Sequence, residues 1–242
     1  MKTLVIIPSR LSATRLPGKP LLKINGLSII SHVFKMAEKA NIGEVIVAAE
    51  DQEIIDDVRI NGGNAILTSK KHKTGTDRIH EAYLKLDRKD IDLVMNVQGD
   101  EPEVDINDIS NLNKKMIESQ SKIGTLAAKI EKVETYKNEN IVKVITRDSF
   151  EKNSFPVAKT FIRKIEKEKN IFHHIGIYCY EVETLKKFVT FNQSKNEIKN
   201  RLEQLRAIDN NIEIKVALAN SSPIGVDTLE DYMAIKKLME YK

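Results

Sequence analysis

Alternating apolar and polar segments in the first part of the chain predict a repeated order of strands and helices. Short runs of β-branched and other apolar residues are typical of buried parallel strands, and apolar residues three or four positions apart are typical of helices. The expected elements are a strand at 3–7, a helix at 29–40, a strand at 44–49, a helix at 52–61, a strand at 64–67, a helix at 77–86 and a strand at 93–97. This order predicts βαβ units that share a mostly parallel sheet.

The second half of the chain carries the same two patterns less regularly. Strands are expected at 125–130, 141–145, 174–180 and 212–218, and helices at 182–191, 197–209 and 228–239. The polar, lysine-rich stretch 147–170 has no clear period and predicts no element. The last helix begins after Asp227 or Thr228, because both residue types cap helix N-termini. We found no internal repeat and no linker, so we expect a single domain.

Composition narrows the class of protein. The chain has 242 residues, of which 41% are apolar, and this is enough for a sizeable core. No apolar run approaches the roughly 20 residues of a membrane helix, so we expect a cytoplasmic protein that does not bind membranes. Cys179, the single cysteine, lies in an apolar run and is expected to be a buried thiol. The net charge of +4 comes from lysines spread along the chain, which disfavours a nucleic-acid partner.

The loop after the first strand is rich in cations. Residues 8–20 read Pro-Ser-Arg-Leu-Ser-Ala-Thr-Arg-Leu-Pro-Gly-Lys-Pro, with Arg10, Arg15 and Lys19 in one loop. Ligands of open α/β sheets bind outside the carboxyl ends of the strands, and cations there would suit a triphosphate. A solvated basic loop is the alternative. Neither of the two common glycine-rich phosphate-binding motifs is present, which disfavours a dinucleotide dehydrogenase or a P-loop kinase.

Acidic residues follow another predicted strand at the same edge of the sheet. The segment Gln98-Gly-Asp-Glu-Pro102 places Asp100 there, and Mg²⁺ at nucleotide sites takes one or two carboxylates together with phosphate oxygens and water. Asp227 is the candidate for the second carboxylate, unless it only caps the last helix. The acids Glu101, Glu103, Asp105 and Asp108 are interpreted as a cluster at a helix start.

The segment Thr74-Gly-Thr-Asp-Arg78 precedes the third predicted helix. Thr74 can cap this helix, and backbone donors together with Arg78 would then face the same ligand. An ordinary helix cap followed by a surface arginine is the alternative interpretation.

Taken in this order, the motifs resemble those of the 3-deoxy-manno-octulosonate (Kdo) cytidylyltransferases, also called CMP-Kdo synthetases. The resemblance covers most of the chain. The segments that carry it are Ile6-Ile-Pro-Ser-Arg10, Thr14-Arg-Leu-Pro-Gly-Lys-Pro20, Gly75-Thr-Asp-Arg78, Asn96-Val-Gln-Gly-Asp-Glu-Pro102, His174-Ile-Gly-Ile-Tyr178, Leu202-Glu-Gln-Leu-Arg206 and Gly225-Val-Asp227.

The resemblance implies a nucleotidyltransferase with a Rossmann-like sheet flanked by helices and a smaller dimerisation or sugar-binding subregion near 125–190. Such an enzyme transfers CMP from CTP to Kdo, releases pyrophosphate, serves lipopolysaccharide biosynthesis, uses Mg²⁺ and forms a homodimer. The implied catalytic residues are Arg10, Lys19, Asp100 and Asp227, of which the two aspartates bind the metal. The implied substrate-binding residues are Ser9, Arg15, Thr76, Arg78, Gln98, His174, Tyr178, Glu203 and Gln204.

One segment departs from the family pattern, and two alternatives stay open. Family members carry Tyr-Phe-Ser-Arg-x-x-Ile-Pro where this chain reads Thr160-Phe-Ile-Arg-Lys-Ile165. Arg163 is kept, but its role as a ligand of the sugar carboxylate is open. Another sugar acid, such as 8-amino-Kdo or a sialic acid, is one alternative substrate. A nucleotide-sugar binding protein without activity is the alternative from another class. We expect CTP to be preferred to purine nucleotides, because a pocket built from backbone around Pro8 to Arg10 would be small.

Overall fold

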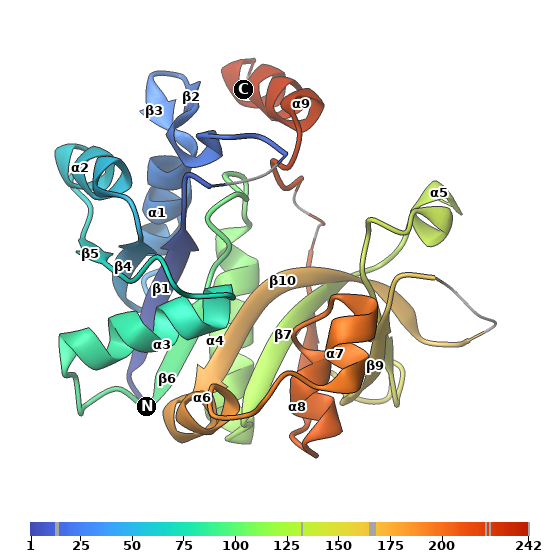
Figure 1. The fold of residues 1–242 in the computed structure, drawn as a ribbon. Coiled ribbons are helices and arrows are strands. Elements are labelled where there is room, and N and C mark those ends of the chain that lie inside the picture. The colour runs from blue at the N-terminus through green and yellow to red at the C-terminus, as the bar shows by residue number, and fades with distance from the viewer. Residues whose placement is uncertain (13–14, 132, 165–167, 221, 223, 242) are drawn as a thin grey trace. The chain divides into compact units, whose positions relative to one another are not determined.

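The computed structural model describes residues 1–12, 15–131, 133–164, 168–220, 222 and 224–241 (Figure 1). Thr14 and Ile165 of the motifs above lie outside the described residues. The chain divides into two compact units. The terminal unit comprises Lys2–Ile106 and Pro223–Lys242, and the central unit comprises Asn107–Ser222 together with Met1.

Parallel strands form the sheet of the terminal unit. Their order is β6-β1-β4-β5, and all of these neighbours pair in parallel. The strands are β1 (Thr3–Ser9), β4 (Gly43–Ala49), β5 (Ala65–Leu67) and β6 (Leu93–Asn96). Leu4 to Ile7 of β1 are 0% exposed, because this strand has a neighbour on each side and helices pack on it. The continuous apolar run of β1 therefore marks a central strand, as expected.

Three amphipathic helices connect these strands. They are α1 (Ile29–Lys39), α2 (Gln52–Ile60) and α3 (Gly75–Leu86). Ser28 caps α1 by accepting a hydrogen bond from the backbone N–H of Ser31, and Thr74 caps α3 by accepting one from Asp77. Such caps satisfy backbone donors that have no partner within the helix. The predicted role of Thr74 as a helix cap is confirmed.

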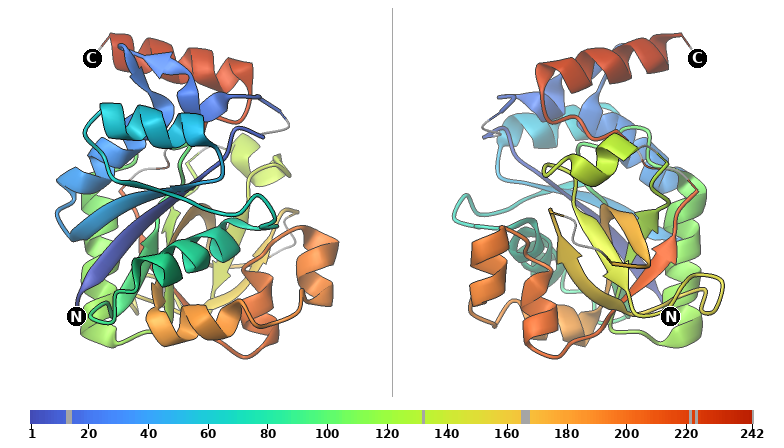
Figure 2. Two further views of the ribbon diagram at one scale, coloured as in Figure 1. Left: turned by 60° about the vertical axis from the view of Figure 1, so that its left-hand side comes forward. Right: turned by 90° about the vertical axis from the view of Figure 1, so that its right-hand side faces the viewer.

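A small second core packs the C-terminal helix of the terminal unit on its N-terminal hairpin. The short helix η1 (Lys19–Leu21) leads into the hairpin of β2 (Lys23–Ile24) and β3 (Leu27–Ser28), and α9 (Leu229–Glu240) packs on it (Figures 1 and 2). The fully buried members of this core are Ile24, Ile29, Val226 and Ile235. The packing brings residues 226–228 close to the loop that follows β1.

The central unit contains a mixed and largely antiparallel arrangement of strands. β11 (Ile214–Leu218) pairs in parallel with β7 (Ile123–Ala128), and β7, β10 (Ile171–Glu181), β8 (Lys143–Thr146) and β9 (Ala158–Ile162) pair in antiparallel order. The helices are α4 (Ile106–Ser119), which begins at the boundary of the two units, α5 (Val133–Lys137), α6 (Val182–Phe188), α7 (Lys195–Asn200) and α8 (Leu205–Asp209). Cys179 of β10 is buried, as expected.

One prediction for the central unit was wrong, and one strand was not predicted. The helix expected over 197–209 is two short helices, because Arg201 has a φ of 54° in the left-handed region and ends α7. Strand β9 lies in the stretch 147–170 that gave no prediction. Only Ala158 and Phe161 of this strand are buried, and the exposed Lys159 and half-buried Thr160 stand between them, so the strand shows no apolar run. Among the described residues, no helix has the length and apolar character needed to span a membrane.

Candidate active site

A cavity of about 370 Å³ lies at the carboxyl edge of the sheet in the terminal unit. Its wall is formed by the loop after β1, the loop before α3, the segment after β6 and the residue before the cap of α9. The predicted site residues on this wall are Ser9, Arg10, Arg15, Lys19, Arg78, Gln98, Asp100 and Asp227. Thr76 is not among the lining residues, because it is buried in the first turn of α3.

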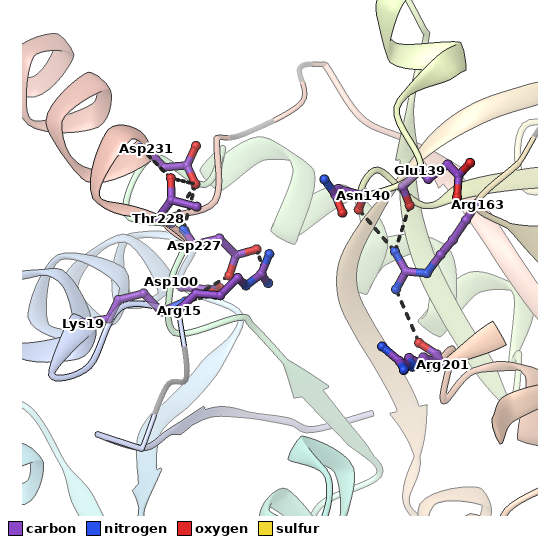
Figure 3. Close-up of polar contacts among 10 residues, drawn as sticks. All are labelled: Arg15, Lys19, Asp100, Glu139, Asn140, Arg163, Arg201, Asp227, Thr228 and Asp231. Carbon is purple, nitrogen blue, oxygen red and sulfur yellow. Dashed lines mark hydrogen bonds and ion pairs between the residues drawn. The ribbon is translucent and has the colours of Figure 1, made fainter. Parts of the chain in front are cut away.

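An ammonium group lies between the two predicted metal-binding carboxylates (Figure 3). Lys19 Nζ is 2.7 Å from Asp100 Oδ2 and 3.4 Å from Asp227 Oδ1. Arg15 also contacts Asp227, at 2.9 Å. Only 11% of the Lys19 side chain is exposed, so this pairing is shielded from solvent more than a surface ion pair. The structure thus joins the basic loop and both aspartates in one charged cluster.

The start of α9 explains why the Asp227 side chain is available to this cluster. Thr228 caps the helix and forms a capping box with Asp231, whose carboxylate accepts from the Thr228 backbone N–H at 2.9 Å. The backbone N–H of Asp227 donates to Asp231 as well. The alternative that Asp227 caps the helix is therefore wrong. The Val226 backbone N–H donates to the Asp100 carbonyl at 2.9 Å, which fixes the two aspartate-bearing loops to each other.

Glu101 is a member of this cluster that the sequence did not identify. Its Oε2 is buried and has no hydrogen-bond partner among the described residues. Burial, together with the neighbouring Asp100 and Asp227, raises the pKa of Glu101 to about 8, and Lys19 opposes the rise. The interpretation of Glu101 as a helix-start residue is wrong, since it precedes α4 and lies beside the paired aspartates. Its position next to Asp100 in the chain was the available signal.

The carboxylates present a donor set that fits Mg²⁺. The position of the Lys19 ammonium demonstrates that the space between Asp100 and Asp227 favours a cation. No group of three or more His, Cys, Asp or Glu side chains is poised to bind a metal in the described parts of the chain. A metal here would therefore take its remaining ligands from phosphate oxygens and water, as Mg²⁺ does at nucleotide sites.

Arg78 lines the cavity, but its guanidinium group is engaged by the protein. It forms a buried ion pair with Glu50, donates to Thr68 Oγ1 at 2.7 Å, and has a side chain only 4% exposed. Glu50 also accepts a hydrogen bond from Ser12 Oγ at 3.1 Å. Arg78 therefore connects α3 to the loop after β1 through Glu50. Direct contact of Arg78 with a ligand stays a prediction.

The central unit gathers three other predicted residues in a buried cluster. His174 Nε2 lies 3.1 Å from Thr125 Oγ1, and the His174 and Tyr178 rings are 5.5 Å apart. Burial, with a smaller contribution from the adjacent His173, lowers the pKa of His174 to about 3, so its imidazole is neutral at pH 7. Burial also raises the pKa of Tyr178 well above its ordinary value, with further contributions from Tyr180 and Glu203. Glu203 therefore lies within electrostatic reach of the Tyr178 hydroxyl.

The turn that carries Glu203 and Gln204 is held by a buried ion pair. Arg206 of α8 donates to both carboxylate oxygens of Glu197 in α7, at 2.8 and 2.5 Å, and stacks over the Phe188 ring at 4.8 Å. Arg206 also lies 3.8 Å from Glu203, but its side chain is only 4% exposed, so the two do not form an ordinary surface pair. The bidentate geometry fixes α7 against α8.

Arg163 contacts backbone carbonyls of two separate loops (Figure 3). It donates to Glu139 and Asn140 at 3.2 and 3.3 Å, and to Asn200 and Arg201 at 3.3 and 3.4 Å. The second pair of carbonyls directly precedes the turn with Glu203. The Arg163 side chain of this altered segment thus supports the backbone next to the buried cluster.

The match to known proteins covers nearly the whole chain. A sequence model of the cytidylyltransferase family matches residues 4–214. The 3-deoxy-manno-octulosonate cytidylyltransferase of Thermodesulfovibrio yellowstonii is 40% identical, over 99% of this chain and 98% of the relative. That of Afipia carboxidovorans is also 40% identical, over 98% of this chain and 96% of the relative.

Solved structures agree with the sequence relatives. The structure of CMP:2-keto-3-deoxy-manno-octonic acid synthetase complexed with CTP has a TM-score of 0.90 and 32% identity, and covers 100% of this chain and 99% of that chain. A UDP-glucose pyrophosphorylase structure with a TM-score of 0.71 and 12% identity, covering 100% of this chain and 99% of that chain, shares the fold alone. These likenesses confirm the expected α/β class, with a mostly parallel mixed sheet flanked by helices. The chain belongs to the 3-deoxy-manno-octulosonate cytidylyltransferase family.

Proposed function

We propose that this protein transfers CMP from CTP to 3-deoxy-D-manno-octulosonate and releases pyrophosphate, a step of lipopolysaccharide biosynthesis. The observation that carries the proposal is the Lys19 ammonium between Asp100 and Asp227 in a cavity lined by a basic loop. This arrangement is suited to a polyanion that arrives with a divalent cation. Identity of 40% over the full length of the Thermodesulfovibrio yellowstonii relative supports the choice of substrates.

The reaction needs no covalent intermediate with the protein. The oxygen of the C2 hydroxyl of the sugar acid attacks the α-phosphorus of CTP, and the bond from this phosphorus to the bridging oxygen of the β-phosphate breaks. Pyrophosphate leaves with the bond's electron pair, and the hydroxyl proton passes to solvent or to a cavity carboxylate. Positioning and charge neutralisation supply most of the acceleration in such displacements.

The residues of the terminal unit have complementary roles in this scheme. Arg10, Arg15 and Lys19 offset the charge of the triphosphate, and Lys19 turns from the carboxylates to the phosphates when CTP binds. Asp100 and Asp227 hold Mg²⁺. When bound, Mg²⁺ supplies charge neutralisation at the phosphate oxygens and makes the attacking hydroxyl more acidic. Ser9, Thr76, Arg78 and Gln98 stay proposed substrate-binding residues of this unit.

The residues of the central unit are proposed to bind the sugar acid. His174, Tyr178, Glu203 and Gln204 offer hydrogen-bonding groups suited to the hydroxyls of an octulosonate. His174 acts there as a neutral imidazole, because its pKa of about 3 leaves it unprotonated at pH 7. The buried position favours specificity, since a site built to bond hydroxyl groups rejects a ligand that lacks them.

Assembly and location follow from family membership as further proposals. We expect a cytoplasmic homodimer whose contact includes residues within 125–190. Light scattering at micromolar concentration measures the assembly. A fully active monomer would contradict the dimer and leave the proposed reaction intact.

Pyrophosphate release tests the proposed reaction directly. Purified protein is incubated with Mg²⁺, CTP and, in separate reactions, Kdo, 8-amino-Kdo and a sialic acid. We expect turnover with Kdo, and clearly less turnover when ATP or GTP replaces CTP. Preference for 8-amino-Kdo or a sialic acid would identify another cytidylyltransferase. Binding of CTP without turnover on any acid would identify a non-catalytic relative.

A further inference from the structure

His72 lies on the wall of the nucleotide cavity but has no role in the function proposed above. It belongs to the loop between β5 and α3, next to the segment Lys73-Thr-Gly75, which also lines the cavity. Its side chain is 21% exposed. Nε2 of its ring forms a hydrogen bond with Glu81 Oε2 in the second turn of α3.

Glu81 is a rigid partner for this ring. Its Oε2 also accepts from the Ser69 backbone N–H at 2.9 Å, and its Oε1 lies 2.7 Å from Lys85 Nζ. Lys85 in turn donates to the Leu67 carbonyl at 2.9 Å. Although burial alone would raise the pKa of Glu81, hydrogen bonds from Lys85, Ser69 and His72 lower it to about 2. The carboxylate is therefore ionised and fixed across the whole neutral pH range.

This arrangement leaves one ring nitrogen of His72 for a ligand. With Nε2 bound to the carboxylate, Nδ1 has no hydrogen-bond partner among the residues that the structure describes. A carboxylate on one ring nitrogen is a common way to fix the orientation of a histidine whose other nitrogen binds a ligand. Because the ring forms part of the cavity wall, a nucleotide in the cavity meets a histidine that is already oriented.

We propose that His72 is a nucleotide-binding residue, which contacts bound CTP through Nδ1, and that Glu81 is the positioning residue that orients its ring. The inference rests on the proposed function, because it takes CTP to be the occupant of the cavity. A purely structural role is the competing explanation, in which the His72–Glu81 bond only fastens the loop to α3. In that case only the bond of Nε2 to Glu81 would contribute, through stability, and Nδ1 would contact no nucleotide.

Two substitutions separate the ring nitrogens. The amide of His72→Gln reaches the position of Nε2 and keeps the bond to Glu81, but it loses the group at Nδ1. The amide of His72→Asn lies near the position of Nδ1 and loses the bond to Glu81. Calorimetric titration with CTP and Mg²⁺ measures nucleotide affinity without turnover, and thermal unfolding measures stability. Steady-state kinetics resolve KM for CTP from kcat.

We expect His72→Gln to weaken CTP binding by about 10-fold or more, as the loss of a hydrogen bond to a charged ligand does. His72→Asn should weaken binding less, although it should unfold at a lower temperature than His72→Gln. Glu81→Gln should raise KM for CTP by a smaller factor. The double variant His72→Gln/Glu81→Gln should bind no worse than His72→Gln alone, since Glu81 acts through His72.

A matched control is His32→Gln. His32 is also partly buried in the terminal unit, and its Nε2 contacts the Ile24 carbonyl at 2.8 Å, but it does not line the cavity. This control should bind CTP as the wild type does.

Wild-type affinity in His72→Gln, or a greater loss in His72→Asn than in His72→Gln, would overturn the inference. Failure of the wild type to bind CTP would contradict the proposed function itself. Repeating the titrations with CMP locates the contact: equal losses place it on the nucleoside monophosphate, and a loss confined to CTP places it on the outer phosphates.

Discussion

The cavity of the terminal unit and the buried cluster of the central unit handle polar groups in opposite ways. In the cavity, cations and carboxylates neutralise one another, as Lys19 does with Asp100 and Asp227. In the central cluster, burial keeps His174 neutral and holds the Tyr178 proton more tightly. A charged site exchanges its internal ion pairs for a charged ligand, whereas a neutral buried site offers directional hydrogen bonds. The two regions are thus suited to a triphosphate and to a polyhydroxylated sugar, respectively.

Removing one carboxylate from the charged cavity should have the largest effect. Asp100→Asn and Asp227→Asn should each lower kcat by about 10²-fold or more, because each removes a charge that the transition state needs. The double variant should be scarcely worse than either single variant, since the two groups hold one metal. Turnover is measured across a Mg²⁺ titration. Asp56→Asn, an exposed change in α2, is the control. Normal activity of Asp227→Asn at low Mg²⁺ would remove Asp227 from the site.

The loss of the Lys19 ammonium should have the second largest effect on turnover. Lys19→Ala should lower kcat by at least about 10-fold and leave the far-ultraviolet circular dichroism unchanged. Its ammonium pairs with two carboxylates now, and with phosphate oxygens in the proposed complex. Lys23→Ala removes an exposed ammonium from the neighbouring hairpin and should have wild-type kinetics. Equal rates in both variants would mean that the basic loop is only a solvated surface.

A substitution that disturbs the buried cluster of the central unit should change the affinity for the sugar acid and leave the affinity for the nucleotide unchanged. Arg163→Lys keeps the charge but replaces the planar guanidinium group by a single ammonium group, which cannot donate to the carbonyls of both loops. We expect KM for the sugar acid to rise by about 3- to 10-fold, as for the loss of one or two hydrogen bonds, with KM for CTP unchanged. Kinetics with each substrate varied in turn measure both constants. A rise in KM for CTP alone would break the assignment of the two regions to different substrates.

The smallest expected effect concerns stability in acid. The folded-state pKa of His174 is about 3, below the ordinary value of 6.5, so the unfolded chain binds a proton that the folded protein excludes between these values. Wild-type stability should therefore fall as the pH drops from 6.5 towards 3. His174→Gln should flatten this fall and keep a hydrogen-bonding group near Thr125. Chemical denaturation at several pH values measures the slope. Parallel slopes for the two proteins would show that His174 is accessible to protons.

Local patterns predicted most of the terminal unit and less of the central unit. Up to residue 97 the order of the longer strands and helices was correct, although η1, β2 and β3 were not predicted. Continuous apolar runs and helical periods mark elements that are buried on one or both faces. Strand β9 lacks such a run, and the break at Arg201 depends on a left-handed residue within a sequence that is otherwise helical in pattern. Short, half-exposed elements leave little periodic signal.

The sequence by itself determined which chemical groups this protein carries, including the basic loop with Lys19 and the motifs of Asp100 and His174. Only the tertiary structure decided how they pair. Lys19 and Asp227 are 208 residues apart, and Thr228 rather than Asp227 caps α9. The sequence likewise could not predict that Arg78 pairs with Glu50 or that Glu101 is buried beside the two aspartates. The hydrogen bond between His72 and Glu81 could not be predicted either. Burial and pairing of charged groups depend on neighbours that folding brings together, whereas apolar periodicity is a property of each segment alone.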